Sequence, residues 1–402
     1  MLKIFKKNFK IENIVLILSI LIILNYLIVL IQFNNFLIKT VISTYIFLVL
    51  LFLFYKPWNF IALKFTLIIL VLIILSNPTY LWDAWAVWLF KAKRIYFDQS
   101  LFVFFDNYSP WSHNDYPLIA PSFAASLANL VGGWNNIFPK LGFLLMCFPP
   151  LIFSTKIFKF NDNILFLILT VILINLEFTL GYVDGLVAIY FTFSAYLINE
   201  VFFNNERSIK YILITFCFLS ILSLIKNEGA VLVLILLSSV ILNNILNKKM
   251  IVQFDKRLII FFSIFFFIFW KFLCYQNGIE NSFLNKETIS SSKNFSVDFK
   301  NLKLIFIYLI LDTKFFLSLI FFLLTFYFIK NKKNFIFCTY ILVFYLIVLF
   351  YTFIITTYPL LYHLETTETR VILSLSYFIS FFSLVEICKK KRLIFDNNFY
   401  NG

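Results

Sequence analysis

The stretch FFSIFFFIFWKFL, residues 261–273, decides the fold class of this chain. It lacks the alternation of polar and apolar residues that a membrane β-strand requires, and as a helix it is apolar on nearly every side. Similar runs fill most of the 402 residues, of which 62% are hydrophobic and 13% charged. About 20 such residues cross the hydrocarbon core of a bilayer as a helix. The sequence therefore predicts an all-α, polytopic transmembrane protein.

Apolar runs of this kind recur along the whole chain. The stretch PLIAPSFAASLANLVGG (117–133) differs because it is shorter and rich in Ala and Ser, and Pro117 and Pro121 lie in its first turns. We interpret it as a juxtamembrane helix that lies on the outer surface. About 12 spans remain, at 12–32, 36–55, 60–77, 137–155, 162–180, 185–203, 208–225, 230–247, 257–275, 314–330, 334–357 and 370–388.

The basic residues predict the orientation of these spans. With 117–133 outside the membrane, every dense basic cluster falls on one side, from MLKIFKKNFK (1–10) to KKKR (389–392). Cytoplasmic loops are enriched in Lys and Arg, so the chain is expected to be integral to the plasma membrane with both termini in the cytoplasm. The first run also lacks a cleavage site and is predicted to be an uncleaved span. Topology accounts for the net charge of +14, so nucleic acid is not an expected partner.

The unusual polar segments all fall on the opposite, external side. They are WDAWAVWLFKAKR (82–94), SHNDYP (112–117), GYVDG (181–185), KNEG (226–229) and YHLETTETR (362–370). Polar residues that merely separate spans would be distributed over both sides. We therefore predict one extracytoplasmic site, built from these turns close to the lipid headgroups.

The segment 82–94 is predicted to be an amphipathic interfacial helix. At about 100° per residue, Asp83, Lys91 and Arg94 share one stripe, and the three tryptophans lie on an adjacent one. Tryptophans at the headgroup boundary are typical of an anchor. An acid at the end of a span is not explained by anchoring, and we predict a functional role for Asp83.

The segment SHNDYP contains one of the two histidines of the chain. His113 and Asp115 lie two residues apart, so on an extended chain they share a face. Such a pair serves as a hydrogen-bonded pair, half of a metal site or a general base. Two histidines, and five cysteines without CxxC spacing, do not indicate a His or Cys metal site. A divalent cation such as Mg or Mn, held by carboxylates, stays open.

The last two polar segments, 226–229 and 362–370, contribute both acidic and basic side chains to the predicted site. Lys226 and Glu228 interrupt an apolar chain at a turn whose Gly229 is expected to adopt positive φ. Arg370, at the mouth of the final span, suits a phosphate because its donors are paired. External carboxylates beside cations favour a phosphate-bearing, lipid-linked substrate, in which a carboxylate deprotonates an acceptor hydroxyl and cations stabilise the departing phosphate. The chain has no phosphate-binding glycine-rich loop or Walker motif.

Taken in order, these five motifs resemble bacterial membrane glycosyltransferases of the GT-C superfamily. The similar branch is glycosyltransferase family 39, which includes protein O-mannosyltransferases and lipid A aminoarabinose transferase. The resemblance covers 60–388 and leaves 1–59 as two extra N-terminal spans and 389–402 as a cytoplasmic tail. External loops are expected at 78–136 and 276–300, the second in the place of the acceptor-side loop. Asp83 is followed by Ala84, where many relatives carry a second acid.

The resemblance implies inverting transfer of a sugar from a polyprenyl-phosphate donor to an envelope glycan, lipid or protein. Asp83 corresponds to the essential acid of the first large external loop, and Asp184 to a second external acid. We accordingly predict catalytic roles for Asp83, Asp184, His113 and Asp115, donor-phosphate binding by Lys91, Arg94, Lys226 and Arg370, and further polar roles for Glu228 and His363.

Two other functions fit a polytopic protein with an external site. O-antigen-type polymerases or ligases depend on arginine-rich external loops, whereas the 276–300 loop contains lysines and no arginine. A transporter or flippase for lipid-linked glycans would place charges at mid-bilayer depth and show inverted repeats, and we find neither.

Overall fold

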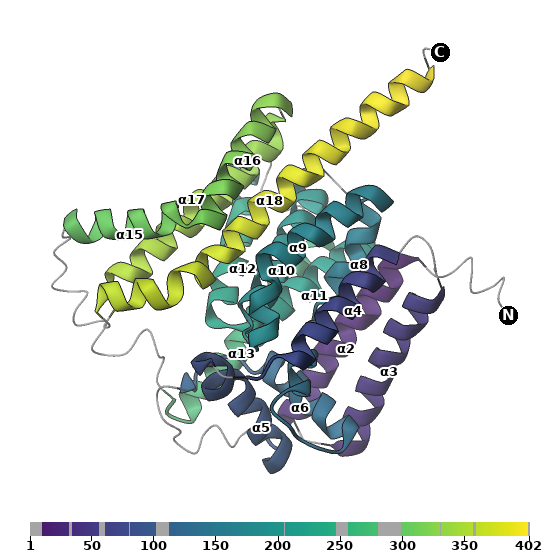
Figure 1. Ribbon diagram of the computed structural model, residues 1–402, viewed down its shortest axis with the longest axis vertical. Helices are drawn as coiled ribbons and strands as arrows, with labels where there is room; N and C mark the ends of the chain where they lie inside the picture. The colour runs from purple at the N-terminus through teal and green to yellow at the C-terminus, as the bar shows by residue number, and fades with distance from the viewer. Residues whose placement is uncertain are drawn as a thin grey trace.

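The structure, a computed structural model, describes the chain in ten segments, and all regular elements within them are helical (Figure 1). This confirms the all-α prediction. Most of the predicted 276–300 loop lies outside the described residues, as does part of the 78–136 loop. The described segments are 10–31, 34–55, 61–79, 81–101, 112–204, 206–246, 256–279, 299–329, 331–356 and 359–400.

The helices follow the apolar runs of the sequence. They are α2 (Ile11–Ile31), α3 (Asn35–Tyr55), α4 (Ile61–Ser76), η1 (Ala84–Trp88), α5 (Leu89–Asp98), α6 (Ile119–Val131), η4 (Phe138–Lys140), α7 (Leu141–Met146), α8 (Phe148–Ile157), α9 (Phe160–Leu180), α10 (Asp184–Ile198), η5 (Asn199–Phe203), α11 (Ile209–Ile225), α12 (Asn227–Leu246), η6 (Lys256–Ile264), α13 (Phe265–Gln276), α15 (Phe299–Leu311), α16 (Thr313–Ile329), α17 (Lys332–Ile354) and α18 (Leu360–Tyr400).

Seven described helical segments are long and apolar enough to cross a membrane. The pair α15 and α16, bent by 70° at Asp312, makes an eighth if it counts as one span. The predicted spans at 60–77, 162–180, 208–225 and 230–247 coincide with α4, α9, α11 and α12, whose described apolar stretches are shorter than 18 residues. Several helices that could span a membrane are thus present, and a total of twelve spans stays a prediction. The seven are Ile11–Ile31, Asn35–Phe54, Phe138–Ile157, Asp184–Phe203, Lys256–Gln276, Lys332–Ile354 and Leu360–Lys391.

Helix α10 lies at the centre of the bundle, and all of its residues from Asp184 to Ile198 are buried. It packs against α11 and against α18, which runs across the whole molecule (Figure 1). A helix that is apolar all round is expected in such a position. Because α10 and α18 pack together, they bring Asp184 and Arg370 into one region. The N-terminal helix α2 also joins this bundle, through α8 and α11.

The segment 117–133 forms a helix, α6, but not one exposed on a surface. Its first ten residues are buried, and it packs against α2, α3, α5 and α7. The small residues explain this close packing: a Cβ at Gly142 of α7 would lie 2.9 Å from the Cα of Ala124. The alanines and serines thus provide packing space within the protein, and the position of α6 at the outer surface of the membrane stays a prediction.

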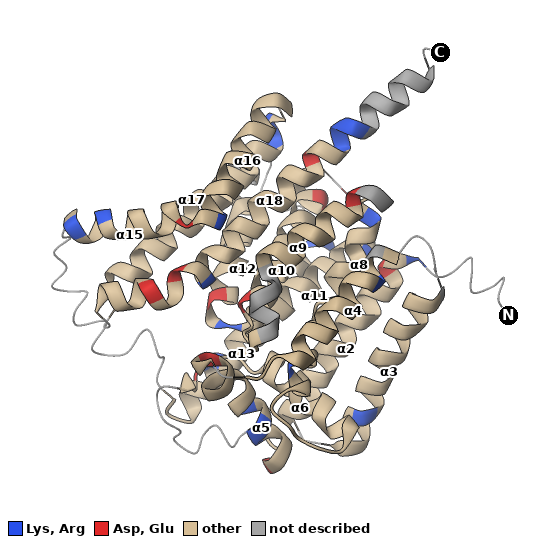
Figure 2. Ribbon diagram, viewed as in Figure 1, with Lys and Arg blue, Asp and Glu red and all other residues tan. Residues whose placement is uncertain are grey.

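Charged residues gather at two ends of the bundle (Figure 2). Asp184 begins α10 and Glu200 follows it, 16 residues or about 24 Å along a helix. At the Glu200 end, Lys389 lies 3.4 Å from Glu200 and Lys391 lies 3.7 Å from Asp162, and Lys156 pairs with Glu12. These lysines belong to the clusters predicted to share one side of the membrane. That this side is the cytoplasm stays a prediction.

Candidate functional site

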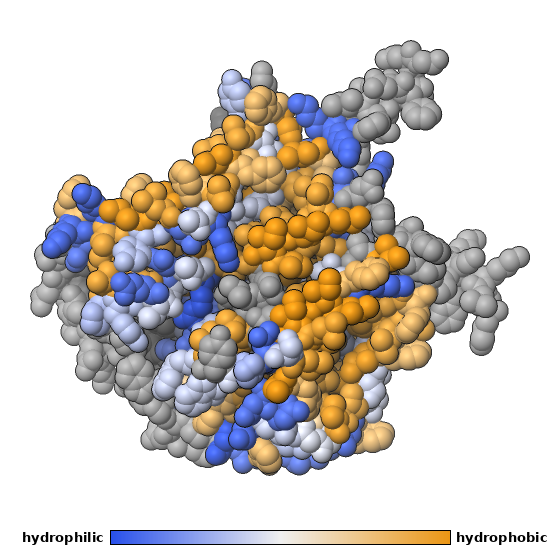
Figure 3. All heavy atoms as spheres, viewed as in Figure 1, coloured by the Kyte–Doolittle hydropathy of each residue, from blue (hydrophilic) through white to orange (hydrophobic). Residues whose placement is uncertain are grey.

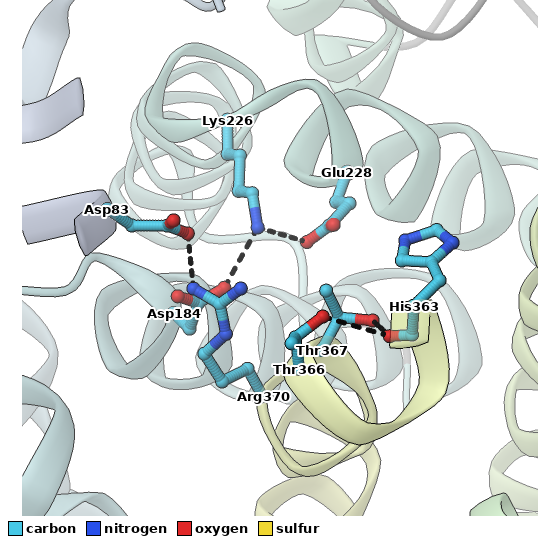
Figure 4. Close-up of polar contacts among 8 residues, drawn as sticks. All are labelled: Asp83, Asp184, Lys226, Glu228, His363, Thr366, Thr367 and Arg370. Carbon is cyan, nitrogen blue, oxygen red and sulfur yellow. Dashed lines mark hydrogen bonds and ion pairs between the residues drawn. The ribbon is translucent and has the colours of Figure 1, made fainter. Parts of the chain in front are cut away.

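An ion pair joins Asp83 to Arg370 at the end opposite those lysines (Figure 4). Asp83 precedes η1, a single π-helical turn, and Arg370 lies on α18. The guanidinium of Arg370 also lies over the ring of Tyr182, 4.9 Å from its centre. Asp83, Tyr182 and Arg370 come from three separate segments, so this contact exists only when α18 is packed in place.

A second ionic chain lies beside the first. The Nζ of Lys226 is 3.0 Å from Asp184 Oδ1 and 3.2 Å from Glu228 Oε2. Lys226 stands between α11 and α12, where its extended backbone interrupts the helices and directs its side chain inward. Burial opposes the charged ammonium, but the two carboxylates outweigh that effect and raise the pKa of Lys226 well above its usual range. Lys226 is therefore a permanent cation.

Gly229 makes the turn at 226–229 sterically feasible, but not through positive φ. It lies in the first turn of α12, and the positive-φ glycines among the described residues are Gly132, Gly181 and Gly278. A Cβ on Gly229 would lie 2.0 Å from the carbonyl oxygen of Leu222. The glycine is therefore required for the close approach of α12 to α11, and the positive-φ prediction was wrong.

The cluster contains three carboxylates, of Asp83, Asp184 and Glu228, and two cations, of Lys226 and Arg370. Each carboxylate already faces a cation, so an incoming phosphate would have to compete with the carboxylates for Lys226 and Arg370. A phosphate that engaged Arg370 in a bidentate manner would release Asp83. The arrangement can thus couple the binding of an anion to the exposure of a general base.

His113 and Asp115 lie in a turn and not on an extended strand. His113 has φ of +49°, and its ring stacks on Tyr116 at 4.8 Å. The carboxylate of Asp115 accepts hydrogen bonds from Lys271 Nζ and Asn227 Nδ2, both at 2.7 Å. The prediction that both side chains share the face of an extended chain was therefore wrong.

Asp115 is nevertheless linked to the charged cluster. Its partner Asn227 lies between Lys226 and Glu228. The backbone carbonyl oxygen of Asp115 accepts 3.0 Å hydrogen bonds from Trp270 Nε1 and Lys271 Nζ. Asp115 thus ties α13 to the turn between α11 and α12. Sequence analysis gave no role to Trp270 or Lys271, although a lysine inside so apolar a run was a signal of a buried partner.

The predicted stripe is not formed, because Lys91, Arg94 and Asp83 each have a different partner. Lys91 is fully buried and donates a 2.5 Å hydrogen bond to the carbonyl of His113, whereas Arg94 pairs with Asp98 at 2.7 Å. The π-helical turn 84–88 changes the angular phase between Asp83 and the rest of the helix. Burial lowers the pKa of Lys91 to about 7, opposed by nearby Asp115. The shared stripe, which assumed a regular α-helix, was wrong.

The tryptophans of this helix separate in the same way. Trp82 and Trp85 are half-exposed and stack edge to face, 5.1 Å apart, whereas Trp88 is buried. The exposed pair fits an anchor in the interface.

His363 lies two turns before Arg370 at the edge of the cluster, and its carbonyl accepts a 2.6 Å hydrogen bond from the hydroxyl of Thr367 (Figure 4).

His113 gives the site a testable pH dependence. Burial, with the charge of Lys91, lowers its pKa to about 4 from an ordinary value of 6.5. Between pH 6.5 and 4 the unfolded chain therefore binds a proton that the folded protein excludes, so the stability falls on acidification. We expect His113→Gln to abolish on the order of 1–3 kcal/mol of this loss. Unfolding free energies in detergent at pH 7 and pH 4.5 would measure it, and an unchanged pH dependence in the variant would contradict it.

The described residues contain no group of three or more His, Cys, Asp or Glu side chains placed to hold a metal ion. The three carboxylates of the cluster each face a lysine or an arginine. In this arrangement the carboxylates face cations of the protein itself, and a bound Mg or Mn ion stays a prediction.

The chain matches no protein-family model, no curated protein and no solved structure in comparisons of these three kinds.

Proposed function

We propose that this chain is an integral membrane glycosyltransferase of the GT-C type. It transfers a sugar, with inversion, from a polyprenyl-phosphate donor to an envelope glycan, lipid or protein on the extracytoplasmic side. The observation that supports this most is the convergence of Asp83, Asp184, Lys226, Glu228 and Arg370 in one cluster (Figure 4). These residues come from four separate segments, and a charged cluster beside membrane-spanning helices is costly to keep without a function.

The proposed reaction uses both signs of charge. The hydroxyl oxygen of the acceptor attacks the anomeric carbon of the sugar, and Asp83 takes the hydroxyl proton. The bond between that carbon and the phosphate oxygen breaks, and its electron pair stays on the polyprenyl phosphate. Arg370 and Lys226 stabilise this charge, and Asp184 holds Lys226 in position.

Asp83 can accept the proton only after it has left Arg370. A phosphate offers Arg370 two oxygens in a geometry that matches its paired donors. In this proposal the donor phosphate displaces Asp83 from the guanidinium, and the freed carboxylate can then accept the proton of the acceptor hydroxyl. Base activation would thus depend on a correctly bound donor.

Transfer assays with the full chain in proteoliposomes test the proposal. We would supply radiolabelled polyprenyl-phosphate hexoses and pentoses with envelope glycans, lipids and peptides, with and without chelator. One donor class is expected to give a labelled product of inverted anomeric configuration. Lys303→Gln, which changes an exposed lysine of α15, is the matched control and should transfer at the wild-type rate. No transfer from any donor by folded protein would overturn the proposal.

Two other outcomes would identify the rival functions. Lengthening of a lipid-linked oligosaccharide without use of a monosaccharide donor would indicate a polymerase or ligase. Movement of an intact lipid-linked glycan across the membrane, with no covalent product, would indicate a flippase.

A further inference from the structure

A groove of about 500 Å³ lies between α16 and α18, far from the charged cluster. Its apolar wall consists of Phe321, Leu324, Phe328 and Ile329 of α16 and Ile387 of α18. Its volume lies within the range of small-molecule sites in proteins. Figure 3 shows apolar atoms over α16 beside the hydrophilic end of α18. The groove therefore has the dimensions and lining for an apolar chain.

Two lysines close one end of this groove. Lys390 donates a 3.2 Å hydrogen bond to the carbonyl of Phe328, near the last turn of α16, and Lys391 lies 3.7 Å from Asp162 with 55% of its side chain exposed. Lys332, at the start of α17, lines a second groove on the other face of α16. Two acids, Asp162 and Glu386, accompany the three lysines here, so the net charge of these side chains is still positive.

The lysines lie along α18 at the distance from Arg370 that separates the two headgroup layers of a bilayer. Arg370 and Lys390 are 20 residues apart on one continuous helix, which corresponds to about 30 Å. That distance is the thickness of the hydrocarbon core. A phosphate bound at Arg370 cannot also reach Lys390, so a phosphate at Lys390 would be a different one.

We infer that this groove binds an anionic phospholipid, with an acyl chain between α16 and α18 and its phosphate at Lys390 and Lys391. A zwitterionic phospholipid fits the apolar part equally well but gains less from the lysines. Basic clusters directly beyond a membrane-spanning helix attract anionic lipids for the same reason. The inference concerns the basic end of the bundle and does not depend on the proposed enzymatic activity.

Native mass spectrometry of the full chain in detergent tests this site. Phosphatidylglycerol and phosphatidylcholine with identical acyl chains would be titrated against wild type and against Lys390→Gln/Lys391→Gln. We expect wild type to prefer phosphatidylglycerol and the double variant to bind it about 30-fold more weakly. Each of the two lysines contributes about half of this change in binding free energy. Phosphatidylcholine affinity should stay unchanged.

Two further variants separate the groove from general electrostatics. Lys300→Gln/Lys303→Gln makes the same charge change on exposed lysines of α15 and should leave phosphatidylglycerol binding within about twofold. Leu324→Trp fills the groove without a charge change and should weaken binding about tenfold. Unfolding midpoints equal to wild type would confirm that the variants are folded.

Three results would overturn the inference. They are equal affinity of wild type for the two lipids, an equal loss in the α15 control, and tighter binding of undecaprenyl phosphate than of phosphatidylglycerol at the groove. The last result would assign the groove to the lipid carrier of the sugar.

Discussion

Asp83→Asn is expected to lower the rate of sugar transfer by a factor of about 10²–10⁴, the usual contribution of a general base. Asn retains the shape of the side chain and a hydrogen bond to Arg370, but it cannot accept the acceptor proton. We expect kcat to fall while the KM for the donor stays similar or decreases, since Arg370 loses its competing carboxylate. Initial rates in proteoliposomes over a range of donor concentrations would measure both constants.

Asp98→Asn is the matched control for this change. Asp98 also pairs with an arginine, Arg94, but both side chains are partly exposed on α5. Its amide variant should therefore transfer at the wild-type rate. A variant of Asp83 that kept kcat and raised only KM would show that Asp83 helps to bind the donor and is not the base.

Lys226→Met is expected to destabilise the protein by about 3 kcal/mol, because it leaves the Asp184 carboxylate buried without its lysine. The side chains of Asp184 and Lys226 are only 4% and 9% exposed. Arg370 lies nearby (Figure 4), so we expect the lower end of the range for a broken buried pair. Unfolding free energies in mixed micelles would measure the effect.

The double variant Asp184→Asn/Lys226→Met sharpens this test. Removing both charges should recover most of the lost stability, since no buried charge then lacks a partner. Lys156→Met provides the control, because Lys156 pairs with Glu12 but its side chain is 34% exposed. That pair should contribute at most about 1 kcal/mol. A double variant as unstable as the sum of its single changes would contradict the expected coupling.

The sequence was sufficient to predict the class of fold, and the five residues of the cluster are among the ten site residues predicted from it. Long apolar runs leave no choice but helices, because only a helix satisfies its own backbone in lipid. Asp83, Asp184, Lys226, Glu228 and Arg370 all stood in turns or at helix ends predicted to lie on one side. Residues at the same ends of the helices lie at a similar depth, and packing of α10 on α18 brings them together.

The partners within that layer could not be predicted. Periodicity assumes 3.6 residues per turn, so the π-helical turn at 84–88 broke the predicted stripe of Asp83, Lys91 and Arg94. The partners of Asp115 lie 112 and 156 residues away, beyond any local pattern. The burial of α6 depends on small residues in its neighbours, such as Gly142, which composition alone cannot reveal.

The long separation of Asp83 from Arg370 also has a consequence for synthesis. The two residues are 287 positions apart, and Arg370 belongs to the last helix of the described chain. At about 5–20 residues per second, a ribosome needs about 15–60 s to make Arg370 after Asp83. By contrast, Asp184 and its partner Lys226 are only 42 residues apart in the sequence. The nascent protein thus holds Asp83 without its cation until α18 has been made, so the site cannot assemble before that helix is synthesised.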